Sequence, residues 1–136
     1  MGHSLGGSTA AALVRAQPIF RAGVNLDGAI VGAPARLGIR RRSLRSPARD
    51  HWAQDRSLRR LFSRSRGPRL ALEVAGLEHM SFSGLPSSRR AARGVGKRPS
   101  RRDISLQSAY IRAFLDRHLR DRPSRLLDGP SRRSRE

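Results

Sequence analysis

The chain has 136 residues, of which 37% are hydrophobic and only 4% aromatic, and it carries a formal net charge of +19. This length suits one small domain with a thin hydrophobic core. The absence of cysteine excludes disulfides and thiolate metal sites. No apolar run approaches the roughly 20 residues that a membrane span needs, and the N-terminus lacks the features of a secretory signal peptide. As written, the sequence is therefore expected to be cytoplasmic, while the location of any longer parent protein stays open.

The positive charge is concentrated in two segments. Residues 36–66 hold eleven arginines against two aspartates, and residues 89–136 carry a similar basic excess. Clustered arginine favours contacts with phosphates, but stacking aromatics are nearly absent from the arginine runs, and the sequence contains no known nucleic-acid motif. We therefore expect nucleic acid to bind only non-specifically, through charge. A basic protein that binds nucleic acid or anionic membranes without catalysis is the alternative function.

The first residues after Met1 match the pattern G-x-S-x-G, which is formed by Gly2, His3, Ser4, Leu5 and Gly6. In a nucleophile elbow of this kind, the serine sits on a sharp turn between a strand and a helix. A side chain at either glycine is expected to collide with the neighbouring strand or helix. Small residues and good helix formers follow, which predicts a helix over 6–15. The strand that usually precedes an elbow is expected to be missing, because the chain starts at Met1.

The next segments alternate between short apolar runs and turn signals. Residues 22–27 predict a buried strand with Asp27 at its C-terminal end. Residues 36–49 have isolated apolar side chains among arginine and serine, which fits a solvated loop, a flexible basic insertion or a spoiled strand. Residues 50–62 suit a short amphipathic helix. The alternation in 69–74 predicts another strand, followed by a loop.

The C-terminal third is more basic and less regular. Residues 87–102 are rich in arginine, glycine, serine and proline, which is typical of a flexible insertion. Residues 104–119 show helical spacing, with Asp103 as a candidate cap. Residues 123–136 are predicted to form a disordered tail. The folded domain is therefore expected to span 1–122.

Three residues fit a catalytic triad. A serine nucleophile needs a general base, and the base needs a carboxylate that orients it. In α/β-hydrolases the chain order is serine, acid, histidine. Asp27 ends the first predicted strand after Ser4, and His79 follows the next credible strand. The sequence thus predicts Ser4 as nucleophile, Asp27 as acid and His79 as base, with the Leu5 N–H as oxyanion donor.

Each of these residues also has a simpler interpretation. Ser4 could only cap a helix, Asp27 could only form a turn before a glycine, and His79 could be an ordinary loop histidine. His51 is expected at the surface. The histidines and acids show no metal-ligand spacing such as H-E-x-x-H, so we expect neither a metal nor a cofactor.

The remaining two histidines are assigned structural roles. His3 is expected to pack within the elbow rather than act as a second base. His118, near the end of the predicted C-terminal helix, is expected to be structural or to favour the helix C-terminus by its charge.

The chain resembles α/β-hydrolases of the platelet-activating factor acetylhydrolase type, particularly bacterial lipase-like members. The similar segments are residues 2–7, 25–28, 77–83, 109–119 and 126–130. They cover roughly the C-terminal half of a family domain. The resemblance implies an α/β fold whose mostly parallel sheet is flanked by helices and lacks its N-terminal strands.

The same resemblance implies the chemistry. Ser4, Asp27 and His79 match the family's catalytic positions, and family members hydrolyse carboxylic esters, including short acyl groups on phospholipids, without a cofactor. The expected partner is a small ester or lipid. Family members carry an apolar strand where this chain has the basic run 40–45. Because the N-terminal half is not represented, the isolated chain is expected to be weakly active or inactive.

Overall fold

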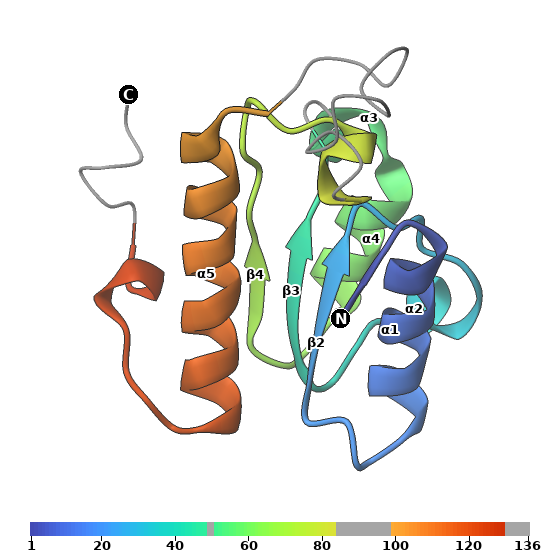
Figure 1. Cartoon of the computed structure of the whole chain (residues 1–136). Coiled ribbons are helices and arrows are strands. Elements are labelled where there is room, and N and C mark those ends of the chain that lie inside the picture. The colour runs from blue at the N-terminus through green and yellow to red at the C-terminus, as the bar shows by residue number, and fades with distance from the viewer. Residues whose placement is uncertain (49–50, 84–98, 130–136) are drawn as a thin grey trace.

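One parallel sheet forms the centre of the molecule. The computed structural model describes residues 1–48, 51–83 and 99–129 (Figure 1). The strands are β1 (Gly2–His3), β2 (Ala22–Leu26), β3 (Arg42–Ser46) and β4 (Arg69–Ala71). They lie side by side in chain order, and every neighbouring pair is parallel. All four carboxyl ends therefore meet at one edge of the sheet.

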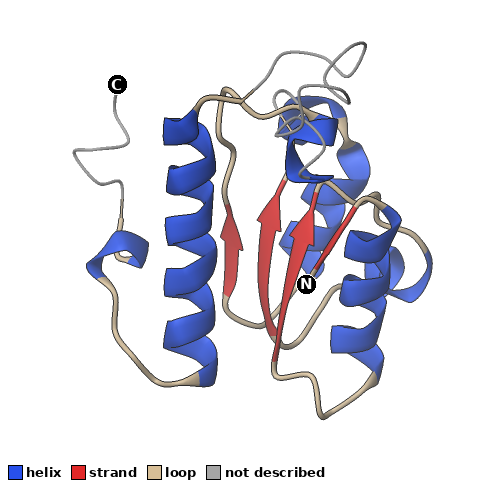
Figure 2. Cartoon of the chain, in the orientation of Figure 1, coloured by secondary structure: helices blue, strands red, loops and turns tan. Residues whose placement is uncertain are grey.

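Helices cover both faces of this sheet (Figure 2). They are α1 (Leu5–Ala16), α2 (Gly32–Leu37), α3 (His51–Gln54), α4 (Arg56–Arg64) and α5 (Arg101–Leu119), with 3-10 helices η1 (His79–Ser83) and η3 (Arg125–Leu127). The helix α5 lies against one face, and α1, α2 and α4 lie on the other (Figure 1). None of the described helices is long and apolar enough to cross a membrane.

The core has two layers, one on each side of the sheet. On the α5 side, the fully buried members are Val24, Leu26, Leu44 and Phe114. On the other side they are Ala11, Val14, Ile30, Ile39, Leu58 and Leu61. Successive residues of a strand face opposite sides, so β2 turns Val24 and Leu26 toward α5 and Gly23 toward α1. Gly23 lets α1 approach closely, because a Cβ there would lie 2.5 Å from Val14 Cγ2.

The basic segment 36–49 contains the strand β3 (Arg42–Ser46). Of the three alternatives left open for this segment, the strand is therefore confirmed, and the solvated loop and the flexible insertion were wrong for these residues. This strand pairs with β2 on one side and β4 on the other. Its Leu44 is completely buried and Arg45 is 3% exposed. Burial of the Arg45 guanidinium lowers its pKa from 12.5 to about 10, and the attraction of Asp55 offsets only part of this effect. The strand is held by its place in the sheet, not by an apolar sequence.

The strand before the elbow is present in short form, which corrects a second expectation. β1 contains only Gly2 and His3, which lie opposite Asn25 and Leu26 of β2. Two residues suffice to lead into the turn at Ser4.

Polar side-chain caps mark the starts of α4 and α5. The predicted helix over 50–62 is two helices, α3 and α4, since Asp55 caps α4 by accepting a 2.7 Å hydrogen bond from Ser57 N. α5 begins three residues earlier than predicted, at Arg101. Its cap is Ser100, and Asp103 completes a capping box by accepting from Ser100 N.

The C-terminal predictions fall partly outside the described residues. Residues 87–98 of the expected flexible insertion, 87–102, lie outside the described residues, as does the end of the tail, 130–136. The last two residues of that insertion, 101 and 102, belong to α5 instead. The start of that tail is ordered, contrary to prediction. Residues 125–127 form η3, and Leu127 packs against the core layer that contains Phe114.

Candidate active site

Ser4 occupies a strained turn between β1 and α1. Its φ of 53° and ψ of −124° lie in a region that L-residues rarely adopt. The turn is held by backbone hydrogen bonds: Ser4 N donates to Leu26 O (3.0 Å), and Ser4 O accepts from Gly7 N (2.9 Å). This is the geometry that a nucleophile elbow requires, because it lifts the serine out of the sheet and leads directly into a helix.

The glycines around the turn differ in what they allow. A Cβ at Gly2 would lie 2.3 Å from the backbone of Gly6, and a Cβ at Gly28 would lie 2.3 Å from Ser4 O. A Cβ at Gly6 would meet no atom of the described chain within 4 Å. The expectation that both flanking glycines exclude a side chain therefore holds for Gly2 and is wrong for Gly6.

Asp27 follows β2 and is fixed on both oxygens. Its backbone has φ 51°, and its N–H donates to Ser46 O at 2.9 Å. The carboxylate is 3% exposed. Oδ2 lies 2.6 Å from His79 Nδ1, and Oδ1 accepts from Ala48 N at 2.7 Å and from His51 Nδ1 at 2.8 Å. Burial by itself would raise the pKa of Asp27, but the hydrogen bonds from Ala48, His79 and His51 outweigh it and hold the pKa below 3.8.

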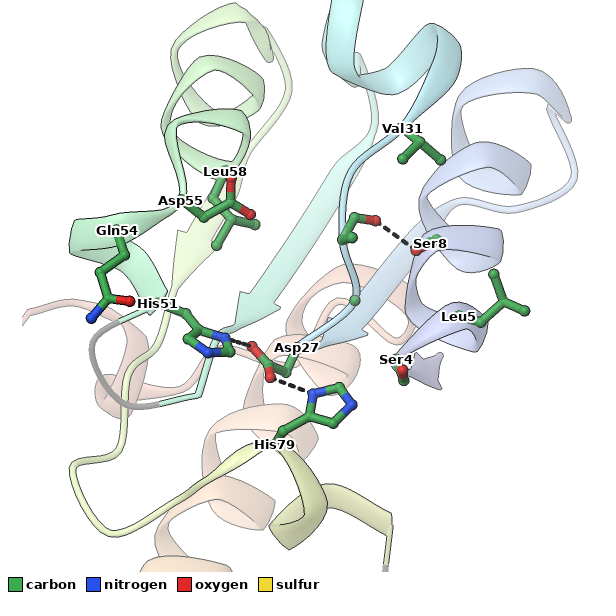
Figure 3. A pocket seen from close by; sticks show the side chains of 12 residues that line it. Ser4, Leu5, Ser8, Asp27, Val31, His51, Gln54, Asp55, Leu58 and His79 are labelled. Atoms are coloured by element: carbon green, nitrogen blue, oxygen red, sulfur yellow. Dashed lines mark hydrogen bonds and ion pairs between the residues drawn. The ribbon is translucent and has the colours of Figure 1, made fainter.

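His79 is the first residue of η1, and it lines the pocket. In the view of Figure 3 its ring lies between the Asp27 carboxylate and the Ser4 side chain. The dashed lines in that figure join Asp27 to His79 and His51, and none joins Ser4 to His79. Hydrogen bonds between nucleophile and base are often long before substrate binds. Because Nδ1 donates to Asp27, the other ring nitrogen, Nε2, is left to accept a proton.

His3 packs against the base rather than lining the pocket. Its Nε2 donates to the His79 carbonyl at 2.8 Å, and the two rings lie 4.7 Å apart. The ring also stacks on Phe82 at 5.9 Å. These contacts attach η1 to β1, as a packing role for His3 requires.

The open pocket beside these residues has a volume of about 610 Å³. It is lined by Ser4, Leu5, Ser8, Asp27, Gly28, Ala29, Val31, His51, Gln54, Asp55, Leu58 and His79 (Figure 3). Leu5 is the first residue of α1, so its N–H has no partner within the helix and can face an anion at the helix N-terminus. The pocket thus combines an apolar wall with a few polar groups, as small-molecule sites usually do.

His51 belongs to this site, although it was expected to be an ordinary surface residue. Its side chain is 47% exposed, but its Nδ1 is bonded to the buried carboxylate. No local motif marks this histidine in the sequence. Its only signal is its position shortly after β3, where the chain turns at the edge of the sheet that carries Ser4 and Asp27.

The described residues offer no group of three or more histidine and acidic side chains that could hold a metal ion. The polar groups of the site are paired with one another instead. Asp27 and His79 form a hydrogen-bonded pair next to a serine on a strained turn, which is an arrangement suited to acyl transfer.

Comparison with known proteins gives one informative similarity. No family model and no curated protein matches the sequence. Among solved structures, the chain is similar to a ferulic acid esterase from Streptomyces cinnamoneus, with 29% identity and a TM-score of 0.78. The alignment covers 98% of this chain and 43% of the esterase chain. The chain therefore spans less than half of the esterase's length. Its α/β fold, a parallel sheet flanked by helices, is similar to the aligned part of that esterase.

Proposed function

We propose that this chain is part of a serine carboxylic-ester hydrolase in which Ser4, Asp27 and His79 act as the catalytic triad. The observation that carries the proposal is the 2.6 Å hydrogen bond between Asp27 and His79 beside a serine held at φ 53°. The similarity to an esterase supports the same reaction class. The alternative, a basic protein that only binds polyanions, gives no reason for a strained serine next to a paired histidine.

The proposed reaction follows from the positions of these groups. His79 Nε2 takes the proton of the Ser4 hydroxyl while Oγ attacks the ester carbonyl. Asp27 keeps Nδ1 protonated and stabilises the imidazolium that forms. The tetrahedral intermediate collapses, the proton passes from His79 to the leaving alcohol, and an acyl-Ser4 intermediate remains. Water then attacks this ester with His79 again as base, releasing the acid and restoring Ser4.

We expect turnover to be weak. We propose the Leu5 N–H as one oxyanion donor, and loss of one donor from an oxyanion hole typically lowers the rate by about 10²–10³-fold. The substrate is proposed to be a small carboxylic ester or a lipid ester of the acetylhydrolase type, because the pocket wall combines exposed Leu5 and Val31 with buried Leu58. A feruloyl ester, the substrate class named for the similar esterase, is the competing choice.

Labelling with a fluorophosphonate, which reacts with activated serines, tests the triad directly. Wild-type protein should label, and Ser4→Ala and His79→Ala should not. Ser8→Ala is the matched control, since Ser8 lines the same pocket but its hydroxyl donates to Ala29 O. Labelling that persists in Ser4→Ala, or no labelling of folded wild-type protein, would contradict the proposal. Hydrolysis of p-nitrophenyl acetate against methyl ferulate then separates the two substrate classes.

A further inference from the structure

We propose that His51 is a positioning residue of this site, which holds the second oxygen of Asp27 so that the first is oriented toward His79. The inference rests on the proposed function, but one of its tests does not require activity. His51 lies in none of the segments that resemble the acetylhydrolase family.

The first argument is the burial of Asp27. Its carboxylate is 3% exposed, so water has little access to its oxygens. A buried carboxylate that lacks donors is strongly disfavoured. Oδ2 is bonded to His79, and Oδ1 is bonded to Ala48 N and His51 Nδ1. Among the described residues, the backbone of Ala48 would be the single donor left to Oδ1 without His51.

The second argument is where the two Oδ1 donors come from. His51 N donates to Ala48 O at 3.1 Å, and His51 O accepts from Asp55 N at 2.8 Å. His51 and Ala48 are thus linked to each other and to the start of α4. The segment after β3 therefore holds Oδ1 from two directions, and this fixes the plane of the carboxylate. His79 approaches from a different part of the chain and meets an oxygen whose direction is already set.

The third argument is the chemistry of the shared carboxylate. Each histidine must donate from Nδ1, so each neutral ring is fixed with its proton on that nitrogen. For His79 this leaves Nε2 as the acceptor that Ser4 needs. His51 takes no part in the proposed proton transfer, because it is bonded to Oδ1 of Asp27, whereas His79 is bonded to Oδ2. His51 therefore acts through Asp27 and not on the substrate.

Two variants separate the hydrogen bond from the bulk of the side chain. His51→Leu fills space but donates nothing, whereas His51→Asn places an amide N–H near the position of Nδ1. We expect the rate constant for fluorophosphonate labelling at saturating probe to fall about tenfold or more in His51→Leu and to recover in His51→Asn. The probe concentration for half-maximal rate should change little, since His51 does not contact the reacting atoms. Equal rates in wild type and His51→Leu, or equally low rates in both variants, would overturn the proposal.

A second readout covers the case in which folded wild-type protein does not label, which would count against the proposed function alone. Long-range ¹H–¹⁵N spectra of histidine report which ring nitrogen of His79 carries the proton. We expect wild type and His51→Asn to show a single Nδ1–H form and His51→Leu to show a mixture. A single, unchanged form in all three proteins would refute the positioning role, whatever the activity.

Discussion

Replacing Arg45 by methionine should stabilise this protein. Arg45 lies in the middle of the sheet and is 3% exposed. Its Nε has no hydrogen-bond partner among the described residues, and its Nη2 donates to Gly28 O over a long distance of 3.4 Å. Burying a charge with so few partners is unfavourable, and apolar replacements of buried charged groups are often neutral or stabilising. Methionine suits the site because it is unbranched and fills irregular space.

The size of the effect follows from the pKa of the guanidinium. Its fall from 12.5 to about 10, at about 1.4 kcal/mol for each pKa unit, means that keeping Arg45 charged costs about 3 kcal/mol of folding free energy. The attraction of Asp55 is already contained in that pKa. The substitution also removes the long bond to Gly28 O and some packing of the stem, which together offset about 1–2 kcal/mol. We therefore expect a net gain of about 1–2 kcal/mol, or a rise in Tm of roughly 3–8 °C.

Urea and thermal unfolding followed by circular dichroism measure this gain, with Arg40→Met as the matched control because Arg40 is exposed. The control should change stability little. The folded-state pKa of Arg45 is below its unfolded value, so the penalty is fully present below about pH 10 and is relieved as pH rises from about 10 to 12.5. The gain should therefore be constant between about pH 6 and 9. A stability of Arg45→Met equal to or lower than wild type would refute the reasoning.

Three further predictions concern the elbow, the last helix and the buried acid. Gly2→Ala should destabilise the fold by more than about 2 kcal/mol in urea unfolding, because its Cβ would meet the Gly6 backbone at 2.3 Å. Gly6→Ala should be neutral or stabilising by up to about 1 kcal/mol. Equal losses of stability in the two variants would contradict the geometry. Ser100→Ala should cost about 1 kcal/mol through loss of the capping box, whereas the exposed mid-helix Ser105→Ala should not; the same unfolding assay compares them. Asp27 has a folded pKa below 3.8, so its ionised form contributes stability above that pH, which is lost as pH falls through the folded pKa. The stability difference between wild type and Asp27→Asn should thus shrink from pH 7 to pH 3, and a difference independent of pH would show that Asp27 is not held as a carboxylate.

The turn at Ser4 and the helices α1 and α5 could be predicted because their signals are local. Gly2, Ser4 and the small residues that follow define a strand-to-helix turn within a few positions, and α1 begins where that pattern predicts. The same holds for Asp27, which ends a short apolar segment. Because the strands are parallel, the serine, the acid and the histidine that follow them in this order all lie at the carboxyl edge of the sheet.

The strand β3 could not be recognised, because its stability is not local. Leu44 is its single large apolar side chain, while Ser43, Arg45 and Ser46 are buried by neighbouring strands and helices. A strand paired on both sides can include polar residues that an isolated segment of the same sequence could not bury. For the same reason the sequence left a loop, an insertion and a spoiled strand as open alternatives for this segment.

The role of His51 depended on that same strand. Because the four parallel strands follow one another in chain order, the segment after each strand contributes to the pocket. Ser4 follows β1, Asp27 follows β2, His51 follows β3 and His79 follows β4. Once 42–46 is known to be a strand, a polar residue soon after it becomes a candidate for the site, and His51 is the one that reaches Asp27.

Arg45 and His51 therefore act at different levels of the same structure. Arg45 destabilises the strand that carries the site, whereas His51 holds the carboxylate at its end. If Arg45→Met raises the stability and leaves the labelling rate of Ser4 unchanged, the buried charge lowers the stability of the fold without affecting the site. If the labelling rate falls as the stability rises, the contact of Arg45 with Gly28 O also shapes the turn that follows Asp27. Measuring both quantities on this one variant separates the two cases.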